Sequence, residues 1–384
     1  MKGAVRVLIA GGGIAGLATG IALRQAGFEA EILERSQEHR EIGAGLMIWP
    51  NGARSLQALD VEIDALTVQD LSVRTWRGRQ IANYSLDPVR KRYGFETCFV
   101  HRADLQTALA RRFGRVGLRL GTEVLGFEQD AESVRVALRD GSTLAVDLLI
   151  GADGLRSSVR RDLLGDGDPV YLGSTVWRGM VERDGLLIRP GSGINWVGRG
   201  AEFLAFQLRG DRIYWAGVTK EPRGEKPGIG GHKADLMERF GTWEKPVPDV
   251  IAATGDTAIL RNDMYDRPGA PSWSRGRVTL VGDAAHPMTP NAGQGACQAL
   301  EDAVALGDSL KHAADPIEAF ALYAKHRLRR ANQVVALSRH TTRAVQIENR
   351  LLCAIRDNLS HFVAQGLYLR TLDQILAPTG SRFG

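Results

Sequence analysis

The chain has 384 residues, of which 44% are hydrophobic and 24% charged, and it carries a net charge of +5. This length and composition are typical of a soluble globular protein with two domains or one large α/β unit. Three widely separated cysteines argue against a disulfide framework and predict a reducing, cytoplasmic location. No apolar stretch is long enough for a membrane span, the glycine-broken N-terminal stretch is unlike a signal peptide, and no basic segment matches a nucleic-acid-binding module.

The first elements in chain order form a predicted βαβ unit. It consists of a buried strand, a helix and a second strand, expected at Val5–Ala10, Ile14–Ala26 and Glu29–Leu33. Before the helix, Gly11 permits a tight turn and Gly13 lets the backbone approach a pyrophosphate. Gly16, in the first turn of the helix, allows close helix–strand packing. Glu34 follows the second strand, where its carboxylate can accept hydrogen bonds from both hydroxyls of a ribose. The unit predicts a dinucleotide site without distinguishing NAD from FAD.

Two further motifs of glycine and aspartate each lie between a predicted buried strand and a predicted helix. DGLRSSVR begins with Asp153 and Gly154, and GDAAHPMTPNAGQG runs from Gly282 to Gly295. For DGLRSSVR, the alternative to ligand binding is that its aspartate or a serine only caps the following helix. The helix after the second can stabilise negative charge at its N-terminus. The strands are expected at Leu144–Gly151 and Val278–Val281, and the helices from near Ser157 and from Ala296 to Lys311.

The order and content of these three motifs resemble the FAD-dependent aromatic hydroxylases, also called group A flavoprotein monooxygenases. In that family the second motif contributes to FAD and NAD(P)H binding, and the aspartate of the third, here Asp283, contacts the ribityl and phosphate region. Gly43–Leu56 resembles the segment that runs along the flavin, and Arg102 resembles an arginine near the FAD phosphates or isoalloxazine. Many relatives have an asparagine where this chain has Cys297, so a side-chain amide contact is not implied there. No metal site is predicted. The resemblance implies FAD contacts from Gly11, Gly13, Ala15, Gly16, Glu34, Arg35, Gly45, Arg102, Val124, Asp153, Gly154, Asp283, Pro290, Gly293, Gly295 and Ala296.

The predicted fold class is α/β, with a Rossmann-like FAD-binding domain, an interleaved β-sheet substrate domain and C-terminal helices. Several strands are expected between Tyr171 and Thr219, a hairpin around Arg77–Gly78 joins them, and Pro222–Lys233 is expected to be a loop. Amphipathic helices at Ala319–Val345 and Leu351–Leu376 are expected to pack on the protein body or in a homodimer, or else on a membrane surface or partner. The predicted boundaries assign 1–70, 97–168 and 267–330 to the FAD-binding domain, 71–96 and 169–266 to the substrate domain, and 331–384 to the C-terminal helices.

The family resemblance implies a monooxygenase that takes electrons from NADH or NADPH and hydroxylates a small phenolic or N-heteroaromatic substrate with O2, via a flavin hydroperoxide. On the predicted substrate sheet, Tyr214 is the candidate base or hydrogen-bond partner for an anionic ring, and Arg178 is the candidate carboxylate ligand. The alternatives are that Tyr214 is only a residue of the hydrophobic core and that Arg178 stacks on Trp177. His286 is expected to be structural rather than a catalytic acid.

Two other functions compete with hydroxylation. The third motif also resembles that of carotenoid epoxidases, so epoxidation of an isoprenoid alkene is one alternative, and an apolar tunnel would favour it. A flavin-binding protein without oxygenase activity is the other alternative. A flavin halogenase is disfavoured, because the chain lacks a tryptophan-x-tryptophan-x-isoleucine motif.

Overall fold

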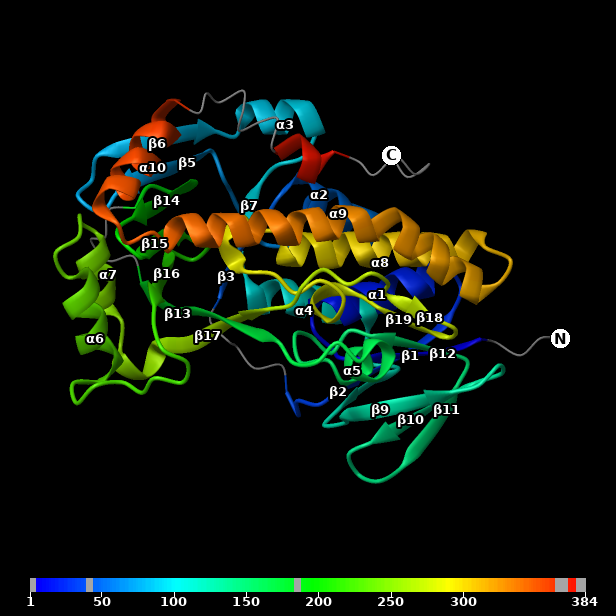
Figure 1. Cartoon of the computed structure of the whole chain (residues 1–384). Helices are drawn as coiled ribbons and strands as arrows, with labels where there is room; N and C mark the ends of the chain where they lie inside the picture. The colour runs from blue at the N-terminus through cyan, green and yellow to red at the C-terminus, as the bar shows by residue number, and fades with distance from the viewer. Residues whose placement is uncertain (1–4, 39–43, 183–187, 363–371, 378–384) are drawn as a thin grey trace.

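The structure is a computed structural model that describes residues 5–38, 44–182, 188–362 and 372–377. Two large sheets organise these residues, and the long helix α9 (Pro316–Val345) runs beside α8 (Gly295–His312) towards the seven-stranded sheet (Figure 1). Just beyond α9, the Ile347 carbonyl accepts a hydrogen bond from the Gly200 backbone N–H, which lies between two strands of that sheet. No helix in the described ranges is long and apolar enough to cross a membrane.

The six-stranded sheet contains the predicted βαβ unit, which is confirmed. Its order is β18-β19-β12-β1-β2-β8, and all its pairings are parallel except that of β18 with β19. Helix α1 (Ile14–Gln25) connects β1 to β2 and packs against α4 (Arg102–Phe113) and α8. The strands are β1 Arg6–Ala10, β2 Glu29–Glu34, β8 Leu118–Leu120, β12 Leu148–Gly151, β18 Ser274–Arg275 and β19 Val278–Leu280.

The prediction of one continuous strand at Leu144–Gly151 is wrong. Asp147 interrupts the run, because its Oδ2 accepts a hydrogen bond from the Arg6 backbone N–H at 2.8 Å. Residues after Asp147 join the parallel sheet as β12, whereas those before it pair in a three-stranded antiparallel sheet. That sheet consists of β9 Val124–Gln129, β10 Val134–Leu138 and β11 Thr143–Val146.

The seven-stranded sheet corresponds to the predicted substrate sheet, and we call it the substrate sheet. The predicted hairpin joins it as β5 and β6, with β5 parallel to β14, so this prediction is confirmed. One face, the outer face, packs against α6 (Gly231–Phe240) and α7 (Val247–Ala253) around four buried tryptophan and phenylalanine rings, those of Trp177, Trp196, Phe203 and Trp215. Its order is β17 Leu260–Asp266, β13 Val170–Glu182, β16 Arg212–Lys220, β15 Ala201–Gln207, β14 Ser192–Val197, β5 Asp70–Thr75 and β6 Gln80–Ser85.

The remaining elements connect or cover the two sheets. Helix α6 begins at Gly231, inside the segment Pro222–Lys233 that was expected to be a loop throughout, so the loop is shorter than predicted. The helix predicted at Leu351–Leu376 is described as α10 (Arg350–Phe362) and a helical turn at 372–376, while 363–371 lie outside the described residues. The other elements are β3 Gly45–Ile48, β4 Leu66–Thr67, β7 Cys98–His101, α2 Pro50–Ala58, α3 Asp87–Tyr93, α5 Ser158–Leu164, η1 Asp256–Ala258, η2 Gly282–Ala284 and η3 Pro290–Ala292.

Candidate functional site

The glycines of the first motif have different structural roles. Gly11 has a φ of +108°, and a Cβ at Gly16 would overlap the Gly11 carbonyl oxygen, so both positions require glycine for local geometry. Gly13 is the N-cap of α1, and no other atom lies within 4 Å of where its Cβ would stand. No side chain caps α1, so the backbone N–H groups of its first turn face this open space.

Glu34 braces the glycine turn. Its Oε2 accepts a hydrogen bond from the Gly12 backbone N–H at 2.6 Å, and its Oε1 accepts one from the Ser36 backbone N–H at 2.8 Å. Gln106 of α4, which the sequence analysis did not single out, donates from Nε2 to the Gly12 carbonyl at 3.0 Å. Each Glu34 oxygen keeps a free lone pair, so the ribose contact stays a prediction that the geometry permits. Arg35, the next residue, is exposed.

Asp153 of the second motif caps the start of α5. Its carboxylate accepts hydrogen bonds from the Ser157 hydroxyl and from the backbone N–H groups of Ser158 and Val159. Burial raises the pKa of Asp153, and these hydrogen bonds act in the opposite direction. The Ser158 hydroxyl donates to the Val124 carbonyl at 2.9 Å, which places Val124 beside the motif. The capping alternative therefore describes what these side chains do in the structure.

Arg160 joins the second motif to the third. Its side chain is fully buried, and Nη1 donates to the carbonyls of Ala284 and Ala285 at 3.0 and 2.8 Å. Its Nε and Nη2 bind Asp166, at 2.8 and 2.5 Å, and Asp166 also binds Arg267 at 3.1 Å. Two motifs more than 120 residues apart in sequence are thus held together by one guanidinium.

The third motif begins in contact with α1. Gly282 has a φ of +57°, and a Cβ there would stand 2.6 Å from the Ala15 Cβ, so the motif packs directly on the helix start. Asp283 is exposed to solvent, yet burial by the surrounding protein raises its pKa, with His286 and Arg102 acting in the opposite direction. The Asp283 carboxylate can therefore be reached by a ligand, although protein atoms surround much of it.

The end of the third motif leads into α8. Pro290 begins η3, and Gly293 follows it with a φ of +59°, where a Cβ would stand 3.0 Å from the Met47 Cε of β3. Gly295 and Ala296 form the first turn of α8, and no other atom lies within 4 Å of where a Gly295 Cβ would stand. The α8 N-terminus is therefore approachable, like that of α1.

A buried ionic network, which the sequence analysis missed, supports this motif from behind. Asp302 of α8 accepts hydrogen bonds from the Gly282 backbone N–H at 2.9 Å, from His286 Nε2 at 2.5 Å and from Arg327 Nε at 2.8 Å. Burial opposes ionisation of Asp302, but His286 and Arg327 hold its pKa below the ordinary value. Arg327 of α9 also binds Glu301 at 2.6 Å. His286 is fully buried in this network, as expected of a structural histidine.

Arg102 is the place where the cofactor-side and substrate-side residues meet. It is the first residue of α4 and is half-buried, and burial lowers the pKa of its guanidinium. Asp283 and Glu34 act on this pKa in the opposite direction, and Arg178 acts in the same direction as burial. Side chains from three other segments are therefore within electrostatic range of Arg102.

Tyr214 faces the FAD-binding side of the substrate sheet and packs on Gly45. A Cβ at Gly45 would stand 2.6 Å from both Phe206 Cζ and Tyr214 Cδ1, so glycine lets β3 approach the sheet closely. Burial raises the pKa of Tyr214 to about 12, which opposes a role as a base at neutral pH. Within the described ranges its hydroxyl has no hydrogen-bond partner, so it stays free to bind a substrate atom.

Arg178 does not stack on Trp177, so that alternative is wrong. Adjacent residues of a strand point to opposite faces of a sheet, and Trp177 lies in the core of the outer face. Arg261 is the arginine at that ring, with its guanidinium carbon 5.5 Å from the ring centroid. Arg178 lies on the other face, where its Nη2 donates to Asn262 Oδ1 at 2.9 Å. It is close enough to Tyr214 to oppose the effect of burial on that hydroxyl's pKa.

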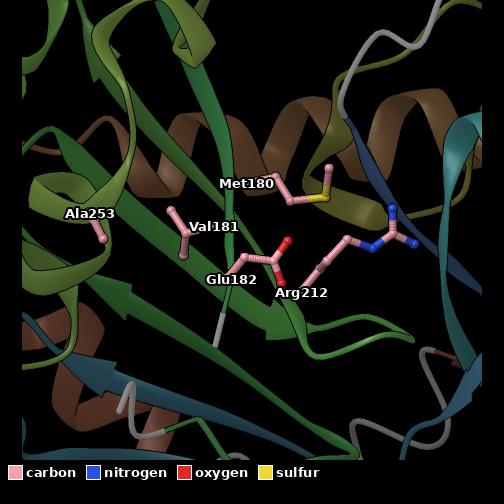
Figure 2. A pocket seen from close by; sticks show the side chains of 5 residues that line it. All are labelled: Met180, Val181, Glu182, Arg212 and Ala253. Carbon is pink, nitrogen blue, oxygen red and sulfur yellow. The ribbon is translucent and has the colours of Figure 1, made fainter. Parts of the chain in front are cut away.

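A cavity of about 480 Å³ opens at one end of the substrate sheet. Figure 2 shows the side chains of Met180 and Arg212 extending to the same side of β13. Met180 is the register partner of Tyr214, and Arg212 binds Asp104 of α4 at 3.3 Å. The cavity therefore lies beside β13 and β16 of the substrate sheet and reaches Ala253 of α7, and its lining contains none of the predicted FAD contacts. Its lining residues are Met180, Val181, Glu182, Arg212 and Ala253.

The donors and acceptors around the three motifs fit an FAD. The N-termini of α1 and α8 offer backbone N–H groups for phosphate or for negative charge on a ring, and Arg102 adds a cation. Glu34 adds a carboxylate that can accept from ribose hydroxyls. No other atom lies within 4 Å of a Cβ position at Gly13, Gly154 or Gly295, so the backbone there can be approached closely.

Comparison with known proteins agrees with this geometry. The FAD binding domain family matches residues 4–166 and 263–338. The chain is 37% identical over 370 residues to the aurachin C monooxygenase/isomerase of Stigmatella aurantiaca, covering 95% of this chain and 96% of the relative. It is 33% identical over 341 residues to the FAD-dependent urate hydroxylase of Klebsiella pneumoniae, covering 87% and 89%. The structure of Klebsiella pneumoniae HpxO with FAD and uric acid matches with a TM-score of 0.92 at 30% identity, covering 98% and 97%. The chain belongs to the FAD-dependent aromatic hydroxylases, the group A flavoprotein monooxygenases, and is an FAD-dependent oxidoreductase.

Proposed function

We propose that this enzyme uses NADH or NADPH and O2 to hydroxylate a small phenolic or N-heteroaromatic substrate. The observation that carries the proposal is the convergence at Arg102, which lies within electrostatic range of Asp283 and Glu34 on the cofactor side and Arg178 on the substrate sheet. Arg178 is in turn within range of Tyr214. The similarity to a urate hydroxylase supports a ring substrate that contains nitrogen.

The three motifs would hold the FAD. The α1 N-terminus with Gly13 would bind the pyrophosphate, Glu34 the ribose, and Asp283 the ribityl region, with the α8 N-terminus beside the ring. Bound FAD supplies the activation of O2, with electrons that come from NAD(P)H. The chain contributes position and electrostatics, because the third motif is fixed by Arg160 from one side and by the Asp302 network from the other.

The substrate sheet would hold and shield the ring. Phe206 stacks on Phe99 of β7 with ring centroids 3.9 Å apart, and Gly45 brings β3 against the same ring, which closes this side to water. Because its pKa is about 12, the Tyr214 hydroxyl acts as a hydrogen-bond partner for an oxygen on the ring and not as the base. An isoprenoid alkene offers no hydrogen bond to Tyr214 or Arg178, so epoxidation is less well supported.

The test is NADH and NADPH oxidation by FAD-loaded protein against phenols, hydroxybenzoates, N-heteroaromatics and purines, with peroxide and product mass measured in the same samples. We expect one compound to stimulate oxidation and to gain one oxygen atom from labelled O2 with little peroxide. Arg178→Met should abolish this stimulation, whereas Arg139→Met, at an exposed position next to β10, should not. No stimulation by any aromatic compound would contradict the proposal and direct the test to isoprenoid alkenes.

The cellular setting and the division into domains belong to the same proposal. Cys98, Cys297 and Cys353 are unpaired, which supports a reducing, cytoplasmic compartment. The strands of the two large sheets alternate along the chain, which supports the proposed interleaving of FAD-binding and substrate segments. A homodimer through the C-terminal helices is expected to give twice the monomer mass by light scattering.

A further inference from the structure

Helix α10 turns an apolar surface to solvent. Leu351, Leu352 and Ile355 are 69%, 50% and 51% exposed. Residues three and four positions apart are neighbours on a helix, so Ile355 lies beside both leucines, and we call these three side chains the aliphatic face. Single exposed aliphatic side chains are ordinary on a protein surface, whereas a group of adjacent ones marks an interaction surface. Figure 1 shows α10 at the end of the molecule that carries the substrate sheet, beside β6.

The opposite side of α10 is polar and faces the protein. Arg356 is largely buried, its Nη2 donates to the Gly198 carbonyl at 3.0 Å, and its guanidinium pairs with Asp357 at 2.9 Å. The buried Cys353 thiol donates to the Ile347 carbonyl at 3.2 Å. An amphipathic helix that packs on a protein buries its apolar stripe, so the orientation of α10 is the reverse of the usual one. Rotation of α10 to bury the aliphatic face would break these hydrogen bonds, which therefore fix its orientation.

Basic side chains surround the start of α10, and we call them the basic cluster. Arg350 is the first residue of α10 and is exposed, and Arg343 is exposed in the last turn of α9. Neither arginine has an ion-pair partner among the residues that the structure describes. Arg199 Nε donates to the Glu348 carbonyl at 2.9 Å, and Lys220 Nζ pairs with the Glu348 carboxylate at 2.9 Å. One carboxylate thus lies among four basic side chains, so this end of the molecule is positively charged.

We propose that the aliphatic face of α10 docks on an anionic phospholipid surface. The aliphatic side chains enter the boundary between the head groups and the acyl chains, and the basic cluster pairs with lipid phosphates. This interaction goes beyond the proposed function and does not depend on it, because no residue of the three motifs and neither Tyr214 nor Arg178 takes part.

A second copy of the chain is a less suitable occupant of this surface. In a two-fold symmetric dimer the same patch of each copy meets its counterpart, so two basic clusters would be brought together. Like charges repel at such a contact, whereas an anionic bilayer neutralises the cluster. A homodimer through the C-terminal helices would therefore use a different face of them.

Co-sedimentation of the FAD-loaded, full-length protein with vesicles tests this docking without turnover. Phosphatidylcholine vesicles with about one-quarter phosphatidylglycerol should bind the protein, and pure phosphatidylcholine vesicles should bind it at least about tenfold more weakly. High salt should release the protein, because it screens the basic cluster from the lipid charge.

Variants test the two parts of the surface separately. Leu351→Ser combined with Ile355→Ser should weaken binding to the anionic vesicles at least about tenfold, through the loss of buried apolar area. The matched control, Val116→Ser combined with Leu125→Ser, changes two exposed aliphatic side chains outside α10 and should bind like the wild type. Arg350→Gln should weaken binding about fivefold, the effect of one basic side chain near an anionic bilayer.

Three results would overturn the proposal: no binding to the anionic vesicles, equal binding to both kinds of vesicle, or wild-type binding by the Leu351→Ser, Ile355→Ser protein. A dimer in light scattering that this double variant converts to a monomer would also overturn it, because the aliphatic face would then belong to a second copy. Since the comparison of the two vesicles uses the wild-type protein, poor folding of a variant would not prevent a decision.

Discussion

Two glycines of the first motif, three positions apart, should give opposite phenotypes when replaced by alanine. At Gly16 the added methyl overlaps the Gly11 carbonyl oxygen, and Gly11 cannot retreat because it already lies against the Ala152 carbonyl. At Gly13 the methyl meets no other atom within 4 Å, and the φ of −75° suits alanine. We therefore expect Gly16→Ala to damage the fold and Gly13→Ala to damage only the binding of FAD.

The expected changes in unfolding free energy follow from two competing effects, helix propensity and steric overlap. Alanine in place of a mid-helix glycine stabilises a helix by about 1 kcal/mol. Overpacking costs about 1–3 kcal/mol, and a clash with backbone that cannot move belongs at the upper end. Gly16→Ala should therefore lose about 2 kcal/mol of unfolding free energy, which lowers Tm by about 2–3 °C for a chain of 384 residues. Gly13→Ala should cost the FAD-free protein less than about 1 kcal/mol, the usual range for a helix cap.

The assay measures Tm of the FAD-free protein by calorimetry and the Kd for FAD by flavin fluorescence. We expect Gly13→Ala to lower Tm by no more than about 1 °C. It should bind FAD at least about tenfold more weakly, a loss of 1.4 kcal/mol. Gly16→Ala should show the larger loss of Tm. Wild-type FAD affinity in Gly13→Ala, or a larger fall in Tm for it than for Gly16→Ala, would refute the assignment of Gly13 to the phosphates.

Three further predictions concern buried groups. Asp302→Asn breaks a buried ion pair and should lose about 3–5 kcal/mol in urea unfolding at pH 7, whereas Asp308→Asn on the same helix should change little. Because the folded-state pKa of Asp302 is lowered, its carboxylate stabilises the fold fully above the ordinary pKa of 3.8, and this stabilisation is lost only as the pH falls below that value. If the loss of unfolding free energy in Asp302→Asn disappeared between pH 6 and 8, this assignment would be contradicted. Tyr214→Phe should lower kcat/KM by about 2–10-fold, the value of one hydrogen bond, and should leave the pH profile between 6 and 9 unchanged, since the hydroxyl pKa is about 12. Burial raises the pKa of the Cys98 and Cys297 thiols to about 12, so neither thiol should be alkylated by iodoacetamide at pH 8 until the protein unfolds. Peptide mass mapping measures the labelling. If Cys297 of the folded protein is labelled as fast as Cys297 in urea, the prediction is wrong.

The cofactor side of the site could be predicted because its constraints are local in sequence. The tight turn at Gly11, the helix start at Gly13 and the carboxylate at Glu34 all lie within one βαβ unit, whose strands and helix follow from apolar periodicity. The interruption at Asp147 could not be predicted in the same way. The apolar run continues across it, and only the hydrogen bond to Arg6, 141 residues away, shows where the chain leaves one sheet for another.

The substrate side depends on registers and on helix packing, which a single sequence does not reveal. Alternation along β13 alone could have shown that Trp177 and Arg178 face opposite sides. The pairing of Asn195 with Leu204 depends on the turn between β14 and β15. In the sequence, Arg327 is indistinguishable from the other charged residues of an amphipathic helix. Its burial follows only from the packing of α9 on α8.

Helix α9 links the two sides of the site, and this gives it a role beyond packing. Near its middle, Arg327 holds Asp302, whose carboxylate accepts from the first residue of the third motif, Gly282. Fifteen residues further, about 22 Å along the helix, the Thr342 hydroxyl donates to Asn291 near the end of the same motif. The loop that would contact the flavin is therefore fixed at both ends by one rigid helix, and Asn291 passes this constraint on to Glu202 in the substrate sheet. Since α9 crosses the predicted boundary at residue 330, the C-terminal helices are better understood as part of the site's frame than as a separate appendage.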